Sequence, residues 1–131
     1  VMLRVIDIQS LNKKSRDSQR LADAKKVQTA LELYYVDNRV YPKSCTTSNC
    51  TAEIEITGSD TLSTSTLKNY IDIMPVGPLY SSDPSKYKWR YFSNDGKTYT
   101  IKVPNEFDTT INTCANNPFT NLGCLIYTNP L

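Results

Sequence analysis

The chain has 131 residues, of which 39% are apolar, and this length and composition are typical of one globular domain with a modest core. They exclude a bundle of membrane-spanning helices and a disordered tail. Its 15 basic and 13 acidic residues leave a formal charge of +2, too small an excess to indicate nucleic-acid binding. The chain has no histidine, which excludes Ser-His-Asp and Cys-His catalysis and the commonest zinc sites other than an all-cysteine one.

Residues 1–37 are predicted to form one long helix, because neither Gly nor Pro occurs before Pro42 and strong helix formers fill residues 12–33. Apolar residues recur there at steps of three and four, and we expect the resulting stripe to pack in the core. The stripe comprises Leu21, Ala24, Val27, Leu31, Tyr34 and Tyr35. Such a helix would span roughly 55 Å, whereas a compact domain of this size has a radius of gyration of about 14 Å. Its first turns should therefore project beyond the domain.

A run of basic residues lies on the same predicted helix and is interrupted by Asp17 and Asp23. It comprises Lys13, Lys14, Arg16, Arg20, Lys25 and Lys26. We expect a solvated helix face with ion pairs three and four residues apart, and the alternative is contact with acidic groups of a neighbouring molecule or with lipid headgroups.

The helix is predicted to end at Asp37 and Asn38, since Asn tolerates the left-handed conformation found at helix ends. Residues 43–85 form a long irregular connection, in which residues 65–71 could make a short helix capped by Ser63 or Ser65.

Residues 86–103 carry the clearest local pattern. Tyr87, Trp89 and Tyr91 alternate with basic residues, an Asn-Asp-Gly turn follows at 94–96, and a second alternating run covers residues 98–103. Two such runs around Asp-Gly predict an antiparallel hairpin whose aromatic face packs on the helix stripe. Residues 125–128 are predicted to add a third strand. The predicted class is therefore α+β, with a long helix (1–37) packed on a small antiparallel sheet in a head of residues 38–131.

The four cysteines are Cys45, Cys50, Cys114 and Cys124. An even count in Thr-, Asn- and Ser-rich surroundings predicts two disulfides and an oxidising compartment, and the alternative is four reduced thiols in a cytosolic protein. Three pairings are possible, of which we favour the two local ones, Cys45 with Cys50 and Cys114 with Cys124. No catalytic residue, metal site or cofactor site is predicted, because no nucleophile lies in a Gly-framed turn and no paired-carboxylate motif occurs.

Residues 15–42, SRDSQRLADAKKVQTALELYYVDNRVYP, resemble type IV pilins and type II secretion pseudopilins. Those proteins carry RDAxRxxDxxxIQxALExYYxDNGxYP where the helix ends in a Tyr-Pro turn. Later blocks at residues 70–75, 78–80, 87–91 and 95–101 follow the order of the family. The resemblance covers about residues 15 to 103. It departs where Arg39 replaces Gly, so that Asn38 would have to make the turn alone.

The resemblance implies a pilin-like fold and a non-enzymatic subunit of a type IV pilus or similar filament, which displays its head outward for adhesion, motility, DNA uptake or secretion. A type II secretion pseudopilin is the alternative within this class. The implied partners are identical or related pilin subunits, the pilus assembly machinery and the inner membrane. It also implies a leader ending in Gly, cut before Phe, and an apolar segment that anchors the subunit in the cytoplasmic membrane before the extracellular filament assembles. We expect Val1 to lie inside or just after that segment.

Two groups of residues gain expected roles from this resemblance. The apolar residues at the start of the helix have nothing in so small a domain to cover them, and we expect them to pack subunits together in the filament; the alternative is a frayed artificial terminus. They are Val1, Leu3, Val5, Ile6, Ile8 and Leu11. The family has a C-terminal disulfide loop on the filament surface, so Pro118 and Phe119 are expected to bind a target; the alternative is a loop that only staples the fold.

Major pseudopilins often bind calcium in their C-terminal loops. Here the acidic residues Asp83, Asp95, Glu106 and Asp108 are scattered, so we expect no calcium site. A function of another class remains open at this stage, namely a secreted ligand-binding module that shares only the fold and uses its Tyr-rich sheet or its disulfide loop.

Overall fold

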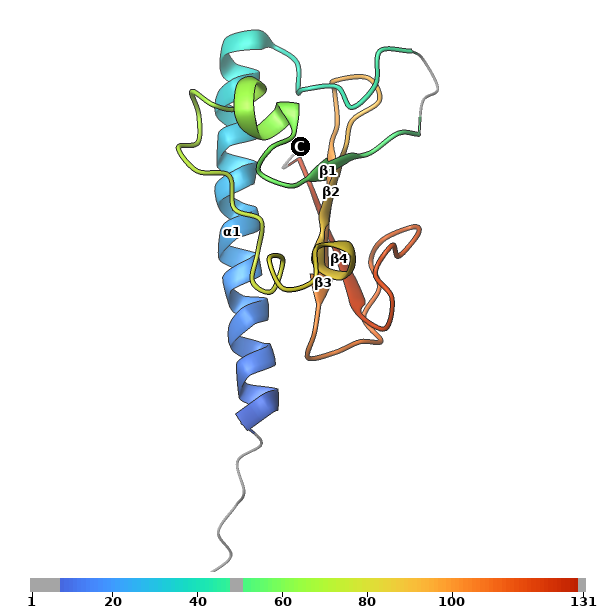
Figure 1. Cartoon of the computed structure of the whole chain (residues 1–131). Coiled ribbons are helices and arrows are strands. Elements are labelled where there is room, and N and C mark those ends of the chain that lie inside the picture. Colours follow the sequence, from blue (N-terminus) through green and yellow to red (C-terminus); the bar gives the residue numbers. More distant parts are fainter. Residues whose placement is uncertain (1–7, 48–50, 130–131) are drawn as a thin grey trace, which may run out of the picture.

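The computed structural model describes residues 8–47 and 51–129 (Figure 1). The predicted packing residues Val1, Leu3, Val5 and Ile6 and the predicted disulfide partner Cys50 lie outside these ranges. The elements, in chain order, are α1 (Ile8–Asn38), β1 (Ile54–Ile56), the π-helical turn η1 (Leu62–Thr66), α2 (Pro84–Tyr87), β2 (Trp89–Phe92), β3 (Thr100–Asn105) and β4 (Gly123–Thr128). The predicted α+β class is confirmed.

The four strands form one antiparallel sheet in the order β1-β2-β3-β4. The predicted hairpin is the β2–β3 pair, in which Tyr91 lies opposite Ile101, but residues 93–99 join the two strands in place of the predicted tight turn at 94–96. The predicted third strand is β4, whose pairing with β3 runs from Thr100 opposite Thr128 to Asn105 opposite Gly123. Strand β1 was not predicted, and it adds a fourth strand beside β2.

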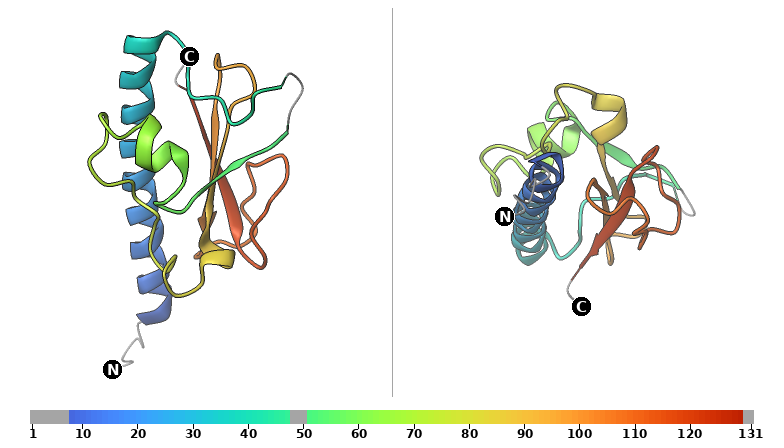
Figure 2. Two further views of the ribbon diagram at one scale, coloured as in Figure 1. Left: turned by 45° about the horizontal axis from the view of Figure 1, so that its top comes forward. Right: turned by 90° about the horizontal axis from the view of Figure 1, so that it is seen from below.

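Helix α1 lies along one face of the sheet, and the chain between Cys114 and Cys124 lies on the opposite face (Figure 2). The long connection after β1 passes beside the upper half of α1 and covers part of it. The first turns of α1 extend past the lower end of the sheet (Figure 1). The head therefore covers only part of one side of the helix.

The core forms where the predicted stripe meets the aromatic face of the sheet. Ala24, Val27 and Leu31 of α1 are fully buried, as is Trp89, and Tyr34 and Tyr35 pack partly buried against them. These six residues lie in the core, as predicted. Leu21, also predicted there, is 44% exposed. Successive helical residues are about 100° apart, and at this level of α1 the neighbouring Arg20 occupies the buried position instead.

The end of α1 also differs from the prediction. Asn38 is the last helical residue, and its side-chain amide donates a hydrogen bond to the carbonyl of Tyr34 at 2.9 Å. The left-handed conformation belongs to Arg39 (φ 60°), whose N–H donates to the carbonyl of Tyr35 at 2.7 Å. Arg39 therefore turns the chain at the position where the resembled family has Gly, a conformation that costs a residue with a Cβ about 1 kcal/mol.

The short helix predicted at residues 65–71 is wrong in position, because η1 lies earlier in the chain. Neither Ser63 nor Ser65 caps it as predicted. Instead the carboxylate of Asp60 accepts hydrogen bonds from the backbone N–H of Ser63 at 3.0 Å and from its hydroxyl at 2.7 Å. Helix α2 was not predicted. Its cap is Asp83, which accepts from the N–H of Lys86 at 3.3 Å.

Candidate assembly surface and binding groove

The first turns of α1 expose two large aliphatic side chains. Ile8 is 68% exposed and Leu11 is 51% exposed, and both were predicted to pack against neighbouring subunits. The described part of the head offers no cover for them, since the sheet ends above this level (Figure 1). Two large aliphatic side chains in water near the start of a helix are a surface that burial against another molecule would stabilise.

The same side of α1 continues upward as an exposed face opposite the sheet. With about 100° between successive residues, Ile8 and Leu11 fall on one side of the helix with Leu33 and Val36, which are 47% and 64% exposed. Between them this side carries mainly small exposed residues, together with Lys26, whose side chain is 70% exposed. We call this side the outer face of α1; its members are Ile8, Leu11, Ser15, Ser18, Ala22, Lys26, Thr29, Leu33 and Val36. Small side chains in the middle of such a face allow a second helix to approach closely.

A buried ionic cluster fixes α1 to the head. Both Arg16 and Arg20 contact the carboxylate of Glu106, just after β3. Arg16 makes a bidentate pair, with Nε 2.7 Å from Oε2 and Nη2 2.8 Å from Oε1, and Arg20 Nη1 is 2.7 Å from Oε2. The carboxylate of Asp17 accepts the backbone N–H groups of Glu106 and Phe107, both at 2.9 Å. We call Arg16, Asp17, Arg20 and Glu106 the helix–head clamp.

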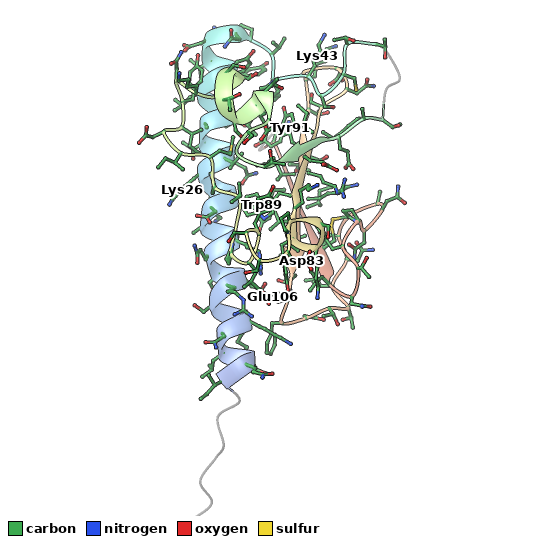
Figure 3. The ribbon with its side chains drawn as sticks, in the orientation of Figure 1. Lys26, Lys43, Asp83, Trp89, Tyr91 and Glu106 are labelled. Carbon is green, nitrogen blue, oxygen red and sulfur yellow. A yellow bond between two sulfur atoms is a disulfide. The ribbon has the colours of Figure 1, made fainter. Side chains whose placement is uncertain are left out.

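The centre of the clamp is shielded from water, since Arg20 is 1% and Glu106 is 4% exposed, while Arg16 is 28% and Asp17 15% exposed at its rim. Figure 3 shows Glu106 beside the lower half of α1, below Trp89 and Tyr91. Burial raises the pKa of the Glu106 carboxyl, but the hydrogen bonds from Arg16 and Arg20 together outweigh it and leave this pKa below its usual value. The carboxylate is therefore ionised at neutral pH and bound to both guanidinium groups.

Sequence reasoning missed the clamp, because it placed Arg16 and Arg20 on a solvated helix face. One signal was present. Arg20 lies four residues before Ala24 and seven before Val27, in the buried row of the helix. A charged residue in that row requires a partner of opposite charge in the head.

The disulfide between Cys114 and Cys124 is present, as predicted. Its loop has a small core of its own, which corrects the expectation for Phe119. That side chain is 5% exposed and packs with Leu122 and the disulfide, with Tyr87 and Ile126 alongside. A loop on the outer side of a sheet lies far from the main core, so its own aromatic residue supplies the burial. Pro118 is partly exposed. Cys45 is disulfide-bonded, whereas Cys50 lies outside the described residues.

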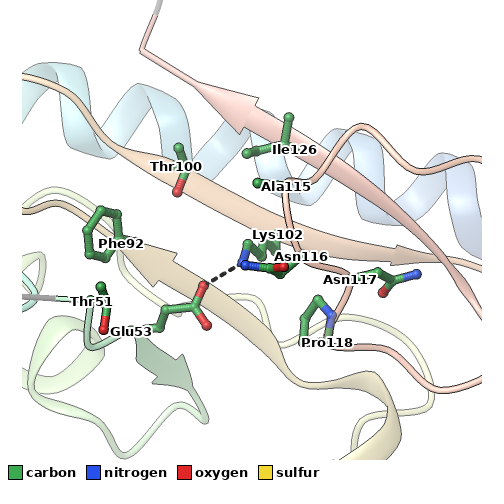
Figure 4. Close-up of a pocket in the computed structure, with 10 residues that line it drawn as sticks. All are labelled: Thr51, Glu53, Phe92, Thr100, Lys102, Ala115, Asn116, Asn117, Pro118 and Ile126. Atoms are coloured by element: carbon green, nitrogen blue, oxygen red, sulfur yellow. Dashed lines mark ion pairs between the residues drawn. The ribbon is translucent and has the colours of Figure 1, made fainter.

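A groove of about 540 Å³ lies between this loop and the segment that precedes β1 (Figure 4). It runs over the sheet face that points away from α1. Its lining comprises Thr51, Glu53, Phe92, Thr100, Lys102, Ala115, Asn116, Asn117, Pro118 and Ile126. Near its centre, Lys102 Nζ lies 3.0 Å from Glu53 Oε2 (Figure 4). The predicted surface residue Pro118 thus lines a concave site, whereas Phe119 does not.

Within residues 8–47 and 51–129, no three His, Cys, Asp or Glu side chains gather in a group that could hold a metal ion. No helix in the same ranges combines the length and the apolar character that crossing a bilayer requires.

No known protein family matches the chain, and no curated protein and no solved structure matches it either.

Proposed function

We propose that this chain is a structural, non-enzymatic subunit of a pilus-like extracytoplasmic filament, with a pilin-like fold. The observation that carries the proposal is the unequal cover of α1. One side of the helix is buried under the head through Ala24, Val27 and Leu31, while the outer face exposes Ile8 and Leu11 at one end and Leu33 and Val36 at the other. The similarity of residues 15–42 to type IV pilins and pseudopilins supports the same function.

Assembly would bury the outer face of α1 against the helices of neighbouring copies. The large aliphatic residues at both ends of the face supply apolar area, and the small residues between them, Ser15, Ser18 and Ala22, let the helices approach. Each contact between two copies is weak. Many copies held in one filament make the combined interaction strong, since each added subunit is bound at several places at once.

The helix–head clamp suits this role, because a head that carries load must not detach from its rod. In the clamp, Arg16 and Arg20 of α1 pair with Glu106 of the head at the level where the helix leaves the head. The disulfide between Cys114 and Cys124 fits a filament outside the cytoplasm, since disulfides persist in oxidising compartments. Before assembly the subunit would be held in the cytoplasmic membrane and delivered to the filament by the pilus assembly machinery.

Electron microscopy of cells that express the full-length gene tests the proposal. We expect filaments that contain this chain, identified by immunogold labelling of the head. Long filaments shed into the medium would identify a type IV pilus, and short cell-bound ones a secretion pseudopilus. Cells that accumulate the folded protein without filaments would contradict the proposal.

A secreted ligand-binding module is the second candidate, and the groove over the sheet favours it. The coding sequence upstream of Val1 separates the two functions. A junction of Gly followed by Phe, as prepilin peptidases cut, supports the filament subunit. A conventional leader with an A-x-A cleavage site supports the free binding module.

A further inference from the structure

We propose that the groove between the Cys114–Cys124 loop and the segment preceding β1 is a binding site for a neutral carbohydrate of one to a few sugar units. The proposal stands independently of filament assembly, because the groove lies on the sheet face opposite α1 (Figures 2 and 4). In a filament held together by the outer face of α1, the groove would point away from the packed helices.

The groove offers no free edge of the strand β3 at its floor. Its floor includes Thr100 and Lys102 of β3, a strand that pairs with β2 on one side and β4 on the other. The backbone groups of β3 are therefore used within the sheet, and an extended peptide could not add to it as a further strand. Over this floor, recognition comes from the side chains of Thr100 and Lys102 and from the shape of the walls.

Charge excludes two classes of ligand. Lys102 is the basic residue that lines the groove, and it is paired with Glu53, while their side chains are 13% and 23% exposed. Because the pair is neutral as a whole, an anion would have to displace Glu53 from Lys102, and a cation would have to displace Lys102 from Glu53. A wholly apolar ligand would remove this ion pair from water without replacing its hydrogen bonds, which is costly. The groove therefore favours a ligand that is neutral and rich in hydroxyl groups.

The pair suits a sugar with adjacent hydroxyls. One hydroxyl can donate to the Glu53 carboxylate while its neighbour accepts from the Lys102 ammonium, so both charges keep their hydrogen bonds. Thr51, Thr100 and Asn116 line the same groove and bring further hydroxyl and amide groups.

The apolar walls of the groove can pack against the C–H face of a sugar ring. Phe92, Ile126 and Pro118 line the groove around the ion pair (Figure 4). The C–H face of a pyranose is apolar and packs on an aromatic or aliphatic wall, while its hydroxyls point to the polar groups. The volume of about 540 Å³ lies in the range of small-molecule sites. Because the groove is open, we expect dissociation constants near the millimolar range, as for weak ligands.

The test uses the oxidised chain and two kinds of probe. The first is an array of immobilised neutral and sialylated glycans. The second is a titration of maltose, lactose, N,N′-diacetylchitobiose and the methyl glycosides of glucose and galactose, followed by amide NMR. We expect at least one neutral glycan or saccharide to bind, with shifts confined to residues 51–53, 92, 100–102, 115–118 and 126.

Substitutions test whether the ion pair of Glu53 and Lys102 binds the sugar. Glu53→Gln and Lys102→Met should each weaken binding at least about fivefold, which is about 1 kcal/mol. The matched control is the neighbouring ion pair of Lys88 and Glu55 at 2.8 Å, which does not line the groove. Lys88→Met and Glu55→Gln should bind as the natural chain does. Thermal unfolding confirms that each variant is folded before its binding is compared.

Four results would overturn the proposal. These are no binding to any neutral glycan or saccharide, binding to sialylated glycans alone, NMR shifts that lie away from the groove, or equal losses in the control pair. None of them bears on filament assembly, which electron microscopy reports separately.

Discussion

The guanidinium Nη1 of Arg20 lies 2.7 Å from Oε2 of Glu106, and this buried pair joins α1 to the chain that follows β3. The two residues are 86 positions apart in the sequence. Arg20 also donates from Nη2 to the carbonyl of Pro78 at 3.1 Å, so the pair reaches the long connection as well. Arg20 thus links α1 to the end of β3 and to the connection between β1 and β2, at the level where α1 leaves the head.

Replacing Glu106 by Gln should destabilise the fold strongly, because the cluster of Arg16 and the buried Arg20 would lose one of its two carboxylates and Arg20 would keep only Asp17, at 3.0 Å, as a counter-charge. We expect a loss of about 3 kcal/mol in the free energy of unfolding, measured by urea denaturation. The control is Glu55→Gln, which removes the carboxylate that pairs with Lys88. The Glu55 side chain is 46% exposed, so this change should lower the free energy of unfolding by less than about 1 kcal/mol. Equal losses in the two variants would mean that the clamp is not a buried structural pair.

Acid should weaken the clamp. The folded pKa of Glu106 lies below its unfolded value of about 4.3, so the stabilisation is fully present above about pH 5 and is lost as pH falls through the folded pKa. Urea unfolding of the natural chain and of Glu106→Gln from pH 7 to pH 3 checks this. We expect the difference in stability between the two proteins to shrink as pH falls. Asp17 faces the same arginines but is common to both proteins; a difference that stays constant or grows would refute the prediction.

Leu31 and Leu21 allow the same substitution to be compared at a buried and at an exposed position of α1. Leu31 is fully buried and Leu21 is 44% exposed, although both were predicted in the core. Leu31→Asp should unfold the head, since an unpaired carboxylate would be buried against the sheet. Leu21→Asp should change the free energy of unfolding by less than about 1 kcal/mol. The fluorescence of Trp89, the one tryptophan of the chain, reports unfolding directly because its ring is fully buried. If Leu31→Asp unfolded cooperatively at the same melting temperature as the natural chain, this would contradict the described core.

The sequence predicted those parts of the fold that repeat locally. The buried row of α1 follows from apolar residues at helical spacing, and the β2–β3 hairpin follows from alternation around Asp95-Gly96. Strand β1 was missed, because three residues are too few to establish a period and the burial of Ile56, opposite Trp89, depends on contacts with distant segments. Leu21 was misplaced, because an apolar residue one position from the buried row looks like part of the stripe.

The sites were less predictable than the fold, because they depend on contacts between distant segments. Arg16 and Glu106 are 90 residues apart, and no local pattern links them. Phe119 was expected at the surface, yet the disulfide folds its loop over that ring. The groove is lined by residues from distant parts of the chain, from Thr51 before β1 to Ile126 in β4. Such groupings arise only once the strands have paired.

The disulfide between Cys114 and Cys124 should stabilise the fold by closing a short loop. Replacing both cysteines by Ser should cost about 2–3 kcal/mol in the free energy of unfolding, as loop entropy predicts for a closure of this length. Peptide mapping of the natural chain without reductant should recover the two cysteines in one linked fragment. A double Ser variant as stable as the natural chain would show that Phe119 and Leu122 hold the loop without the bond.

The filament proposal is tested most directly at Leu11, which is 51% exposed on the outer face of α1. Leu11→Glu in the full-length gene adds a charge where the neighbouring helix would pack, and leaves the core and the clamp untouched. The matched control is Ile73→Glu, which alters an aliphatic residue that is 80% exposed but lies outside α1. The measurement is the amount of sheared or cell-bound filament by electron microscopy, with the cellular level of the subunit followed by immunoblot. We predict at least about a tenfold loss of filaments for Leu11→Glu at an unchanged subunit level, and natural filaments for Ile73→Glu. Natural filament numbers in Leu11→Glu cells would contradict packing through the outer face of α1.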